Sequence, residues 1–250
     1  MASAENAPGQ PAEEPAAAVA PVWHTAVFLV VLIGFSVLQS RPRFMAKAAQ
    51  APSRIPTYVL TICYELFLLG YVWLLGLRPY KKTLRELIGG RWDRWADFWR
   101  DVGVAFLFWL AVLAVVSGIS YAVRFKGMEA AKFLLPQTPA EMVVWVVLAT
   151  SAGFCEELIF RGYLQRQFLA LTQSAAAAVA LQGIVFGLGH LYQGGRAAIV
   201  ISVYGAMFGA LAVMRKSLRP GMMQHATQDT VSGIAAHFLA KYRFFQMLKF

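Results

Sequence analysis

The sequence has 250 residues, of which 58% are hydrophobic and only 14% are charged. A soluble domain of this size carries about 25% charged residues, so the composition indicates an integral membrane protein. The net charge of +10 comes from 23 Lys and Arg against 13 Asp and Glu, and the basic residues lie between apolar segments, where loops meet anionic headgroups. We therefore expect membrane lipids as partners and no binding of nucleic acid.

The first 20 residues are rich in Ala, Pro and Glu and contain no Lys or Arg. This composition cannot bury enough apolar surface to order itself, so it predicts a disordered tail at residues 1–20. The apolar run that follows ends at Gln39-Ser40-Arg41 without the features of a cleavage site, and we interpret it as a retained first span. Residues 21–250 are then expected to form a single transmembrane domain.

Seven apolar segments approach or exceed the roughly 20 residues that a membrane-spanning helix needs. They predict an all-α fold, a polytopic membrane helix bundle of about seven transmembrane helices. The fifth is only weakly apolar, and the seventh can cross the membrane only if its polar side faces the protein interior. The sixth carries Gly205 and Gly209, a small-xxx-small face suited to close helix packing. The segments are 22–39, 57–77, 101–124, 140–169, 174–192, 197–214 and 220–240.

The stretch from Arg78 to Arg100 separates the second and third segments and is strongly basic. It also contains Trp92, Trp95 and Trp99 at helical spacing, a pattern typical of an interfacial amphipathic segment. The alternative is an ordinary loop with an aromatic belt, which also lies at the membrane surface. Lys and Arg are nearly equal in number on the two sides of the predicted bundle, so they do not determine its orientation. We expect a multi-pass protein of the plasma (inner) membrane.

Glu156, Glu157 and Arg161 interrupt an apolar run that starts near Ala140 and continues past Leu169. Each ionised group in hydrocarbon costs from about 2.5 kcal/mol upward, so such residues are expected to be functional. Glu157 and Arg161 are spaced i, i+4 with the acid first, the better order for an ion pair. Glu156 points about 100° away around the helix, and a carboxylate without a cation partner in low dielectric suits a general base. The alternative is a buried ion network that only holds helices together.

Other polar residues at membrane depth are few. His190 ends the fifth segment, and His225 and Asp229 are four residues apart, on one face of a helix. From Gln173, near the expected turn between segments four and five, Glu156 lies 17 residues back and His190 lies 17 residues forward. In two antiparallel helices these side chains arrive at the same level. The structural alternatives are a core histidine bonded to a carbonyl and a polar contact between helices.

Five further residues receive structural interpretations. Glu65 lies alone in the second segment, where we expect a structural polar contact. Cys63 and Cys155 have no CxxC partner or zinc-finger spacing and are interpreted as small buried hydrophobic side chains. His24 and His237 lie near segment ends, and we expect both at the membrane interface.

Three motifs occur in order along these segments: Glu-Glu-x-x-x-Arg at 156–161, Phe-x-x-x-His at 186–190 and His-x-x-x-Asp at 225–229. In this order and spacing, within a motif core at 140–240, they resemble the CAAX protease and bacteriocin-processing (CPBP, or Abi) family of intramembrane endopeptidases. The resemblance implies hydrolysis of a peptide bond in a membrane-associated protein or peptide. Type II prenyl-protein proteases of this family remove a C-terminal tripeptide after a prenylated cysteine. The implied catalytic residues are Glu156, Glu157, Arg161, His190, His225 and Asp229.

The resemblance also implies a role for each motif. Glu156 and His190 would activate the hydrolytic water, the adjacent glutamate and the arginine would support them, and His225 with residue 229 would stabilise the oxyanion. Position 229 is Asp229, whereas the prenyl-protease members typically have Asn there. An ionised aspartate cannot donate a hydrogen bond to an oxyanion. It could instead orient His225, hold a cation, or donate when protonated.

The cofactor is left open by the resemblance, because the family was long described as metal-dependent and a glutamate-based mechanism is the competing view. If a divalent metal such as zinc is present, Glu156, His190 and His225 would supply the three protein ligands of a catalytic site.

Two other functions are compatible with the same residues. One is a non-catalytic membrane scaffold or immunity-type protein with the same fold. The other is a small transporter or proton pathway with buried carboxylates, against which the absence of an inverted repeat argues.

Overall fold

A computed structural model describes residues 15–43, 50–125 and 133–241. Every regular element in these ranges is helical, which confirms the all-α prediction. The α-helices are α1 (Val22–Gln39), α3 (Ile55–Tyr71), α4 (Leu84–Ile88), α5 (Trp95–Ala122), α7 (Pro139–Glu156), α8 (Gln165–Thr172), α9 (Ala175–Gly189), α10 (Gly195–Arg215) and α11 (Arg219–Lys241). The other elements are the π-helices η1 (Val72–Leu77) and η3 (Glu157–Leu164) and the 3₁₀-helices η2 (Arg78–Tyr80) and η4 (Leu191–Gln193).

The long helices coincide with the seven predicted segments to within a few residues. Five stretches in the described part of the chain are long and apolar enough to cross a membrane: α1, Ile55–Tyr80, α5, Pro139–Thr172 and α10. The fifth predicted segment, α9, is apolar but has only 15 residues. The seventh, α11, has 23 residues and is not among these five stretches.

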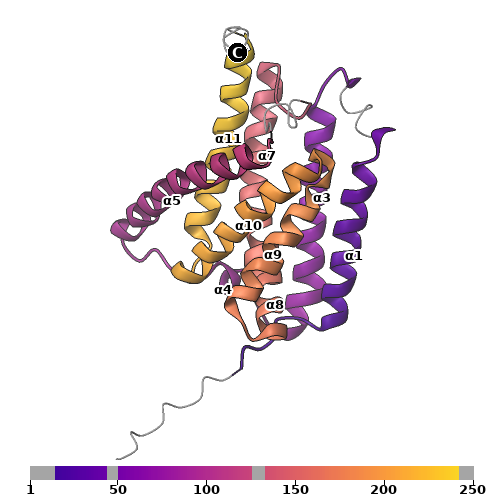
Figure 1. The fold of residues 1–250 in the computed structure, drawn as a ribbon. Coiled ribbons are helices and arrows are strands. Elements are labelled where there is room, and N and C mark those ends of the chain that lie inside the picture. Colours follow the sequence, from indigo (N-terminus) through magenta and orange to yellow (C-terminus); the bar gives the residue numbers. More distant parts are fainter. Residues whose placement is uncertain (1–14, 44–49, 126–132, 242–250) are drawn as a thin grey trace, which may run out of the picture.

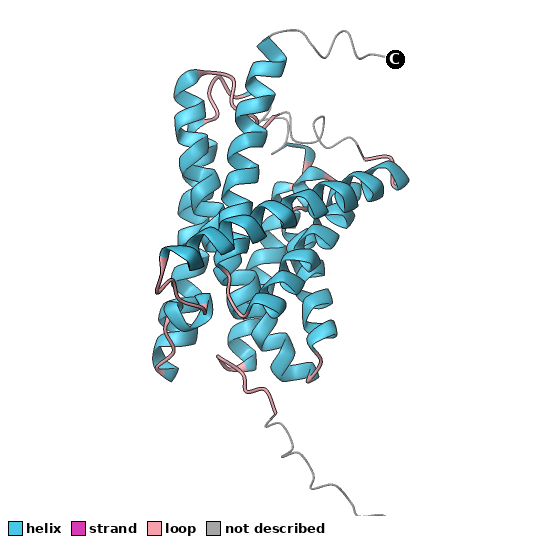
Figure 2. Ribbon diagram, turned by 90° about the vertical axis from the view of Figure 1, so that its left-hand side faces the viewer, coloured by secondary structure: helices cyan, strands magenta, loops and turns pink. Residues whose placement is uncertain are grey.

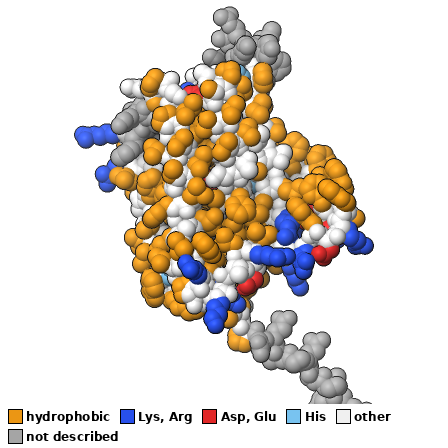
Figure 3. Space-filling model, turned by 180° about the vertical axis from the view of Figure 1, so that it is seen from behind, with side chains coloured by type: hydrophobic (Ala, Val, Ile, Leu, Met, Phe, Trp, Pro, Cys, Tyr) orange, Lys and Arg blue, Asp and Glu red, His pale blue; other side chains and the backbone are white. Residues whose placement is uncertain are grey.

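The helices form a bundle in which α7 and its continuation, η3 and α8, occupy the centre. Helix α11 packs along α7, α3 packs on α7 as well, and α9 packs closely against α10 (Figure 1). Helix α5 crosses the bundle obliquely over α10 and α11 (Figure 2). Large apolar side chains such as Val30, Leu60 and Leu107 are more than 60% exposed, and hydrophobic side chains cover most of the face in Figure 3. An exposed surface of this kind fits contact with lipid.

The local sequence determines where α7 begins. Thr138 accepts a hydrogen bond from the Glu141 N–H and Pro139 occupies the first turn, so the helix starts with a capping box. The Glu141 carboxylate also accepts a hydrogen bond from the backbone N–H of Arg54, just before α3. This contact ties the first turn of α7 to the first turn of α3.

The predicted interfacial segment at 78–100 is not one helix. It divides into η2, the short α4 capped by Thr83, and the first residues of α5, where Trp95 and Trp99 are largely exposed. Trp95 and Trp99 thus belong to a helix that continues into the bundle. Gly89 pairs with Ser217 in an isolated bridge, which holds this segment against the turn between α10 and α11.

Residues before α1 make specific contacts. The backbone N–H groups of Val19 and Ala20 donate to the side-chain oxygen of Gln167, at 2.7 and 3.1 Å. The remainder of the predicted tail, residues 1–14, lies outside the described residues. His24, expected at the membrane interface, is fully buried within the protein, and its Nδ1 lies 2.7 Å from the Tyr163 hydroxyl. Burial is possible because the hydroxyl and a backbone carbonyl satisfy both ring nitrogens.

Small residues set the distance between α9 and α10. A Cβ at Gly183 would lie 2.7 Å from the Ser202 carbonyl oxygen, and one at Gly205 would lie 3.0 Å from the Phe186 ring. The close packing predicted for the glycines of the sixth segment is therefore present.

We predict that Gly183→Ala destabilises the protein by about 1–3 kcal/mol, because the added methyl group meets rigid backbone of α10. Gly103→Ala is the matched control, since nothing lies within 4 Å of its Cβ position. Thermal unfolding of both variants in the same detergent measures the difference. Equal unfolding temperatures for the two variants would contradict the packing described here.

Candidate active site

Three of the six catalytic candidates, Glu156, Glu157 and Arg161, lie midway along the 34-residue helical stretch Pro139–Thr172. Glu156 is the last residue of α7 and Glu157 is the first residue of the π-helix η3, whose eight residues are all buried. π-Helical turns are rare and occur frequently at functional sites. The wider turn begins at the junction between the two adjacent carboxylates.

Glu157 and Arg161 form the predicted ion pair. The Arg161 Nη1 atom lies 3.0 Å from Glu157 Oε1, and both side chains are almost completely buried. The guanidinium also donates to the Gly205 carbonyl oxygen on α10, at 3.2 Å. It lies 4.5 Å from the ring centre of Phe186 and 5.0 Å from that of Phe208, within the range of cation–π contacts. The pair therefore joins η3 to α9 and α10.

His225, on α11, contacts all three carboxylates of the predicted site. Its Nδ1 is 3.2 Å from Glu157 Oε1, and its Nε2 is 3.7 Å from Glu156 Oε2 and 3.6 Å from Asp229 Oδ2. The imidazole is 4% exposed. Since a carboxylate only accepts, Nδ1–H donates to Glu157 and the opposite edge of the ring faces the other two acids. The Asp229 side chain is about one-third exposed, and its backbone carbonyl accepts a hydrogen bond from Trp145.

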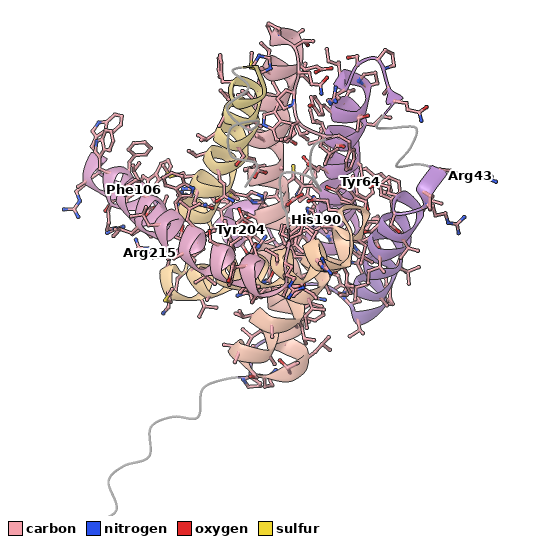
Figure 4. All side chains as sticks on the ribbon, turned by 45° about the horizontal axis from the view of Figure 1, so that its top comes forward. Arg43, Tyr64, Phe106, His190, Tyr204 and Arg215 are labelled. Atoms are coloured by element: carbon pink, nitrogen blue, oxygen red, sulfur yellow. The ribbon has the colours of Figure 1, made fainter. Side chains whose placement is uncertain are left out.

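His190 follows the last residue of α9 and lies near the middle of the bundle (Figure 4). Its Nδ1 is 2.8 Å from the Phe186 carbonyl oxygen, which can only accept. The proton of the neutral ring is therefore on Nδ1, and Nε2 is an acceptor. Gln173 lies between α8 and α9, at the turn that the residue count predicted.

Glu156 and His190 line the same cavity, which has a volume of about 740 Å³. The cavity extends between α1 and α3, and its wall is mostly apolar, with a row of polar side chains on α3. Among the described residues that line it there is no Lys or Arg. A carboxylate and an imidazole acceptor thus face one space that is large enough for a peptide segment. The polar row consists of Thr57, Thr61, Tyr64 and Glu65.

The six predicted residues fall into two sets. In the first set, His225 contacts Glu156, Glu157 and Asp229, and Arg161 pairs with Glu157. The second set is His190, which has no hydrogen bond or ion pair with these described residues but lines the same cavity as Glu156. In the described part of the chain no three His, Cys, Asp or Glu side chains are arranged to hold a metal ion. The geometry therefore does not bring the predicted ligand set of Glu156, His190 and His225 together.

Two polar residues at the cavity were not predicted as part of the site. The Glu65 carboxylate accepts a hydrogen bond of 2.7 Å from the Ser151 hydroxyl on α7, as expected for a structural contact, but it also lines the cavity. Tyr192, two residues after His190, lines it as well. The sequence contains a signal for Glu65, an isolated carboxylate in an apolar helix. No comparable signal identifies Tyr192.

Comparison with protein families adds an independent observation. Residues 138–231 match the model of the family described as type II CAAX prenyl endopeptidase Rce1-like. Over these residues the chain is similar to the CAAX protease (CPBP) family. The matched region begins at the cap of α7 and ends within α11, so it contains all three motifs. Searches of curated proteins and of solved structures gave no match.

The match indicates a protease of the CAAX endopeptidase type in general terms. The described part of the chain also has five helical stretches that are long and apolar enough to cross a membrane. Both observations agree with the position of the motif residues inside the bundle.

We predict that Arg161→Met lowers the free energy of unfolding by about 3–5 kcal/mol, because it leaves Glu157 as an uncompensated buried charge. The double variant Glu157→Gln/Arg161→Met should recover part of this loss, since glutamine can still accept from His225. Thermal unfolding of the parent, both single variants and the double variant measures the coupling. Strictly additive effects would show that the two side chains do not stabilise one another.

Proposed function

We propose that this protein hydrolyses a peptide bond of a membrane-anchored protein or peptide, with Glu156 and His190 activating the water. The observation that carries the proposal is that these two residues, from different parts of the helical bundle, line one cavity. Glu156 is the one carboxylate of the adjacent pair that is not held by Arg161. Its function as a base fits a position at the cavity wall.

The first step follows from the two acceptors. A water in the cavity donates one hydrogen bond to Glu156 and the other to His190 Nε2, since His190 Nδ1–H is already bonded to the Phe186 carbonyl. Glu156 takes a proton as the water oxygen attacks the substrate carbonyl carbon, and the carbonyl oxygen becomes the oxyanion. When the carbon–nitrogen bond breaks, the same proton passes to the leaving amine.

His225 is our candidate for the group that stabilises the oxyanion. Glu157 accepts from Nδ1, so a proton at Nε2 can be donated at the ring edge that faces Glu156. Asp229 lies on the same edge and does not need to donate itself. In this proposal the aspartate orients the imidazole and favours its protonated form, where an asparagine would contribute a hydrogen bond.

The cavity supports a substrate with an extended, largely apolar segment. Its walls include many apolar side chains of α1 and α3, while Thr57 and Thr61 line it with hydroxyl groups that can bond a peptide backbone. A prenylated C-terminal segment is one substrate of this chemistry, and we propose it as the first to test. A location in the plasma (inner) membrane is likewise proposed.

We expect Glu156→Gln and His190→Ala each to lower the rate of cleavage by about 10²-fold or more, because each removes a group that activates water. The assay uses the purified protein in detergent, a membrane-anchored peptide with a prenylated cysteine near its C-terminus, and mass spectrometry of the products.

Glu86→Gln is the matched control, because Glu86 is an exposed glutamate of α4 remote from the cavity. Full activity of Glu156→Gln would exclude the proposed mechanism. A well-folded parent protein that cleaves no membrane-anchored peptide would instead favour the non-catalytic scaffold.

A glutamate-based mechanism also predicts how activity depends on metal. Cleavage should persist after treatment with 1,10-phenanthroline, in protein whose metal content is far below one ion per chain by elemental analysis. The support is that the described residues do not gather three metal ligands. Loss of activity with the chelator, and its return with one equivalent of zinc, would show that a metal is required.

A further inference from the structure

A second hollow, of about 280 Å³, lies between α4, α8, the start of α9 and the end of α10. It shares no lining residue with the cavity that contains Glu156. Seven of its lining residues are Leu, Ala or Val. The others are Arg161, Gln165, Arg166, Lys216 and Ser217. Its wall therefore combines three cations with apolar surface and no carboxylate.

Two of these cations are available to an anion. Arg161 is already paired with Glu157, but within the described residues no Asp or Glu forms an ion pair with Arg166 or Lys216. One nitrogen of Arg166 donates to the carbonyl oxygens of Glu86 and Leu87, at 3.0 and 3.1 Å. These bonds hold the guanidinium in place at the rim of the hollow.

A buried acceptor in the wall has no partner. Gln165 is 6% exposed, and its side-chain nitrogen donates to the Gly209 carbonyl, while its Oε1 atom has no hydrogen-bond partner among the described residues. Buried polar atoms without a partner are uncommon in folded proteins, and Gln165 lines the hollow, so a donor bound there is a candidate partner for this atom. A hydroxyl group of a ligand would supply one.

The hollow lies at one end of the bundle. Lys216 directly follows α10, and Arg166 lies in the last turns before the connection from α8 to α9. The basic segment with η2 and α4 is at the same end, where Lys and Arg side chains gather below an apolar face in Figure 3. Cations next to the ends of apolar helices are at the level of lipid headgroups.

We propose that this hollow binds an anionic lipid whose headgroup carries a phosphate and a hydroxyl. The phosphate lies between Arg166 and Lys216, the hydroxyl donates to Gln165 Oε1, and an acyl chain packs on the Leu, Ala and Val side chains of the wall. A lipid accounts for the apolar wall, which free phosphate leaves unused. The proposal is independent of the proteolytic mechanism.

The test measures binding of lipid to the full chain in neutral detergent, by native mass spectrometry, with no assay of activity. Dioleoylphosphatidylglycerol should bind more tightly than dioleoylphosphatidylcholine. Lys216→Asn should weaken binding of the former about fivefold, as expected for one cation at a headgroup. Lys216 has a φ of 49°, a left-handed conformation that asparagine tolerates.

Lys81→Asn is a closely matched control. Lys81 follows η2 in the same basic segment, has a φ of 56° and is exposed, so the substitution changes charge and backbone in the same way. Gln165→Leu tests the proposed hydrogen bond from the headgroup hydroxyl. This substitution should weaken binding of phosphatidylglycerol and leave the binding of dioleoylphosphatidic acid, whose headgroup has no such hydroxyl, unchanged. Unfolding temperatures establish that each variant is folded.

Equal effects of Lys216→Asn and Lys81→Asn would overturn the proposal, because binding would then reflect surface charge alone. Inorganic phosphate that displaces the lipid at equal concentration would also overturn it, since the acyl chain would contribute nothing. About fivefold weaker binding of phosphatidylglycerol to Lys216→Asn, with unchanged binding to Lys81→Asn, supports it.

Discussion

The burial of the Arg161 guanidinium is the constraint on which the rest of the structure depends. An isolated charge at this depth is too unfavourable to keep, so every neighbouring element contributes a compensating group. Glu157 supplies the opposite charge, α10 a carbonyl oxygen, and Phe186 and Phe208 the faces of aromatic rings. His225 on α11 then satisfies the remaining side of Glu157. The helices of the site are thus arranged around one ion pair.

This pairing also explains how two adjacent glutamates acquire different environments. Glu157 is buried and forms contacts with both Arg161 and His225. Glu156 instead lines the cavity, and its contact with His225 is to Nε2, on the opposite edge of the imidazole ring. A single acid could not both anchor the helices and accept a proton from water. The hairpin of α8 and α9 then returns the chain to the same cavity, where His190 and Glu156 both line the wall. In the proposed mechanism, the structural carboxylate, Glu157, and the reactive one, Glu156, are adjacent in the chain.

Much of this arrangement follows from the sequence alone, because hydrophobicity and helical spacing are local properties. They predict the helix limits, the ion pair, and the equal depth of Glu156 and His190. They do not predict the π-helix η3, which depends on packing from several helices, or the contacts of His225 with three acids. The same holds for His24, assigned to the interface from its place in the chain, whose buried partner Tyr163 lies 139 residues away.

Asp229 shows how a departure from the usual motif can be compatible with the same chemistry. Three carboxylates lie around His225, and Arg161 pairs with only one of them. A positive charge on His225 would therefore offset part of the remaining negative charge. Because Nδ1–H already donates to Glu157, protonation of the ring places a second N–H donor at Nε2, on the edge that faces Glu156. An asparagine at this position could donate directly but would remove one of the negative charges that favour the imidazolium. In the proposed mechanism Asp229 therefore acts through His225, and the oxyanion needs no second donor from α11.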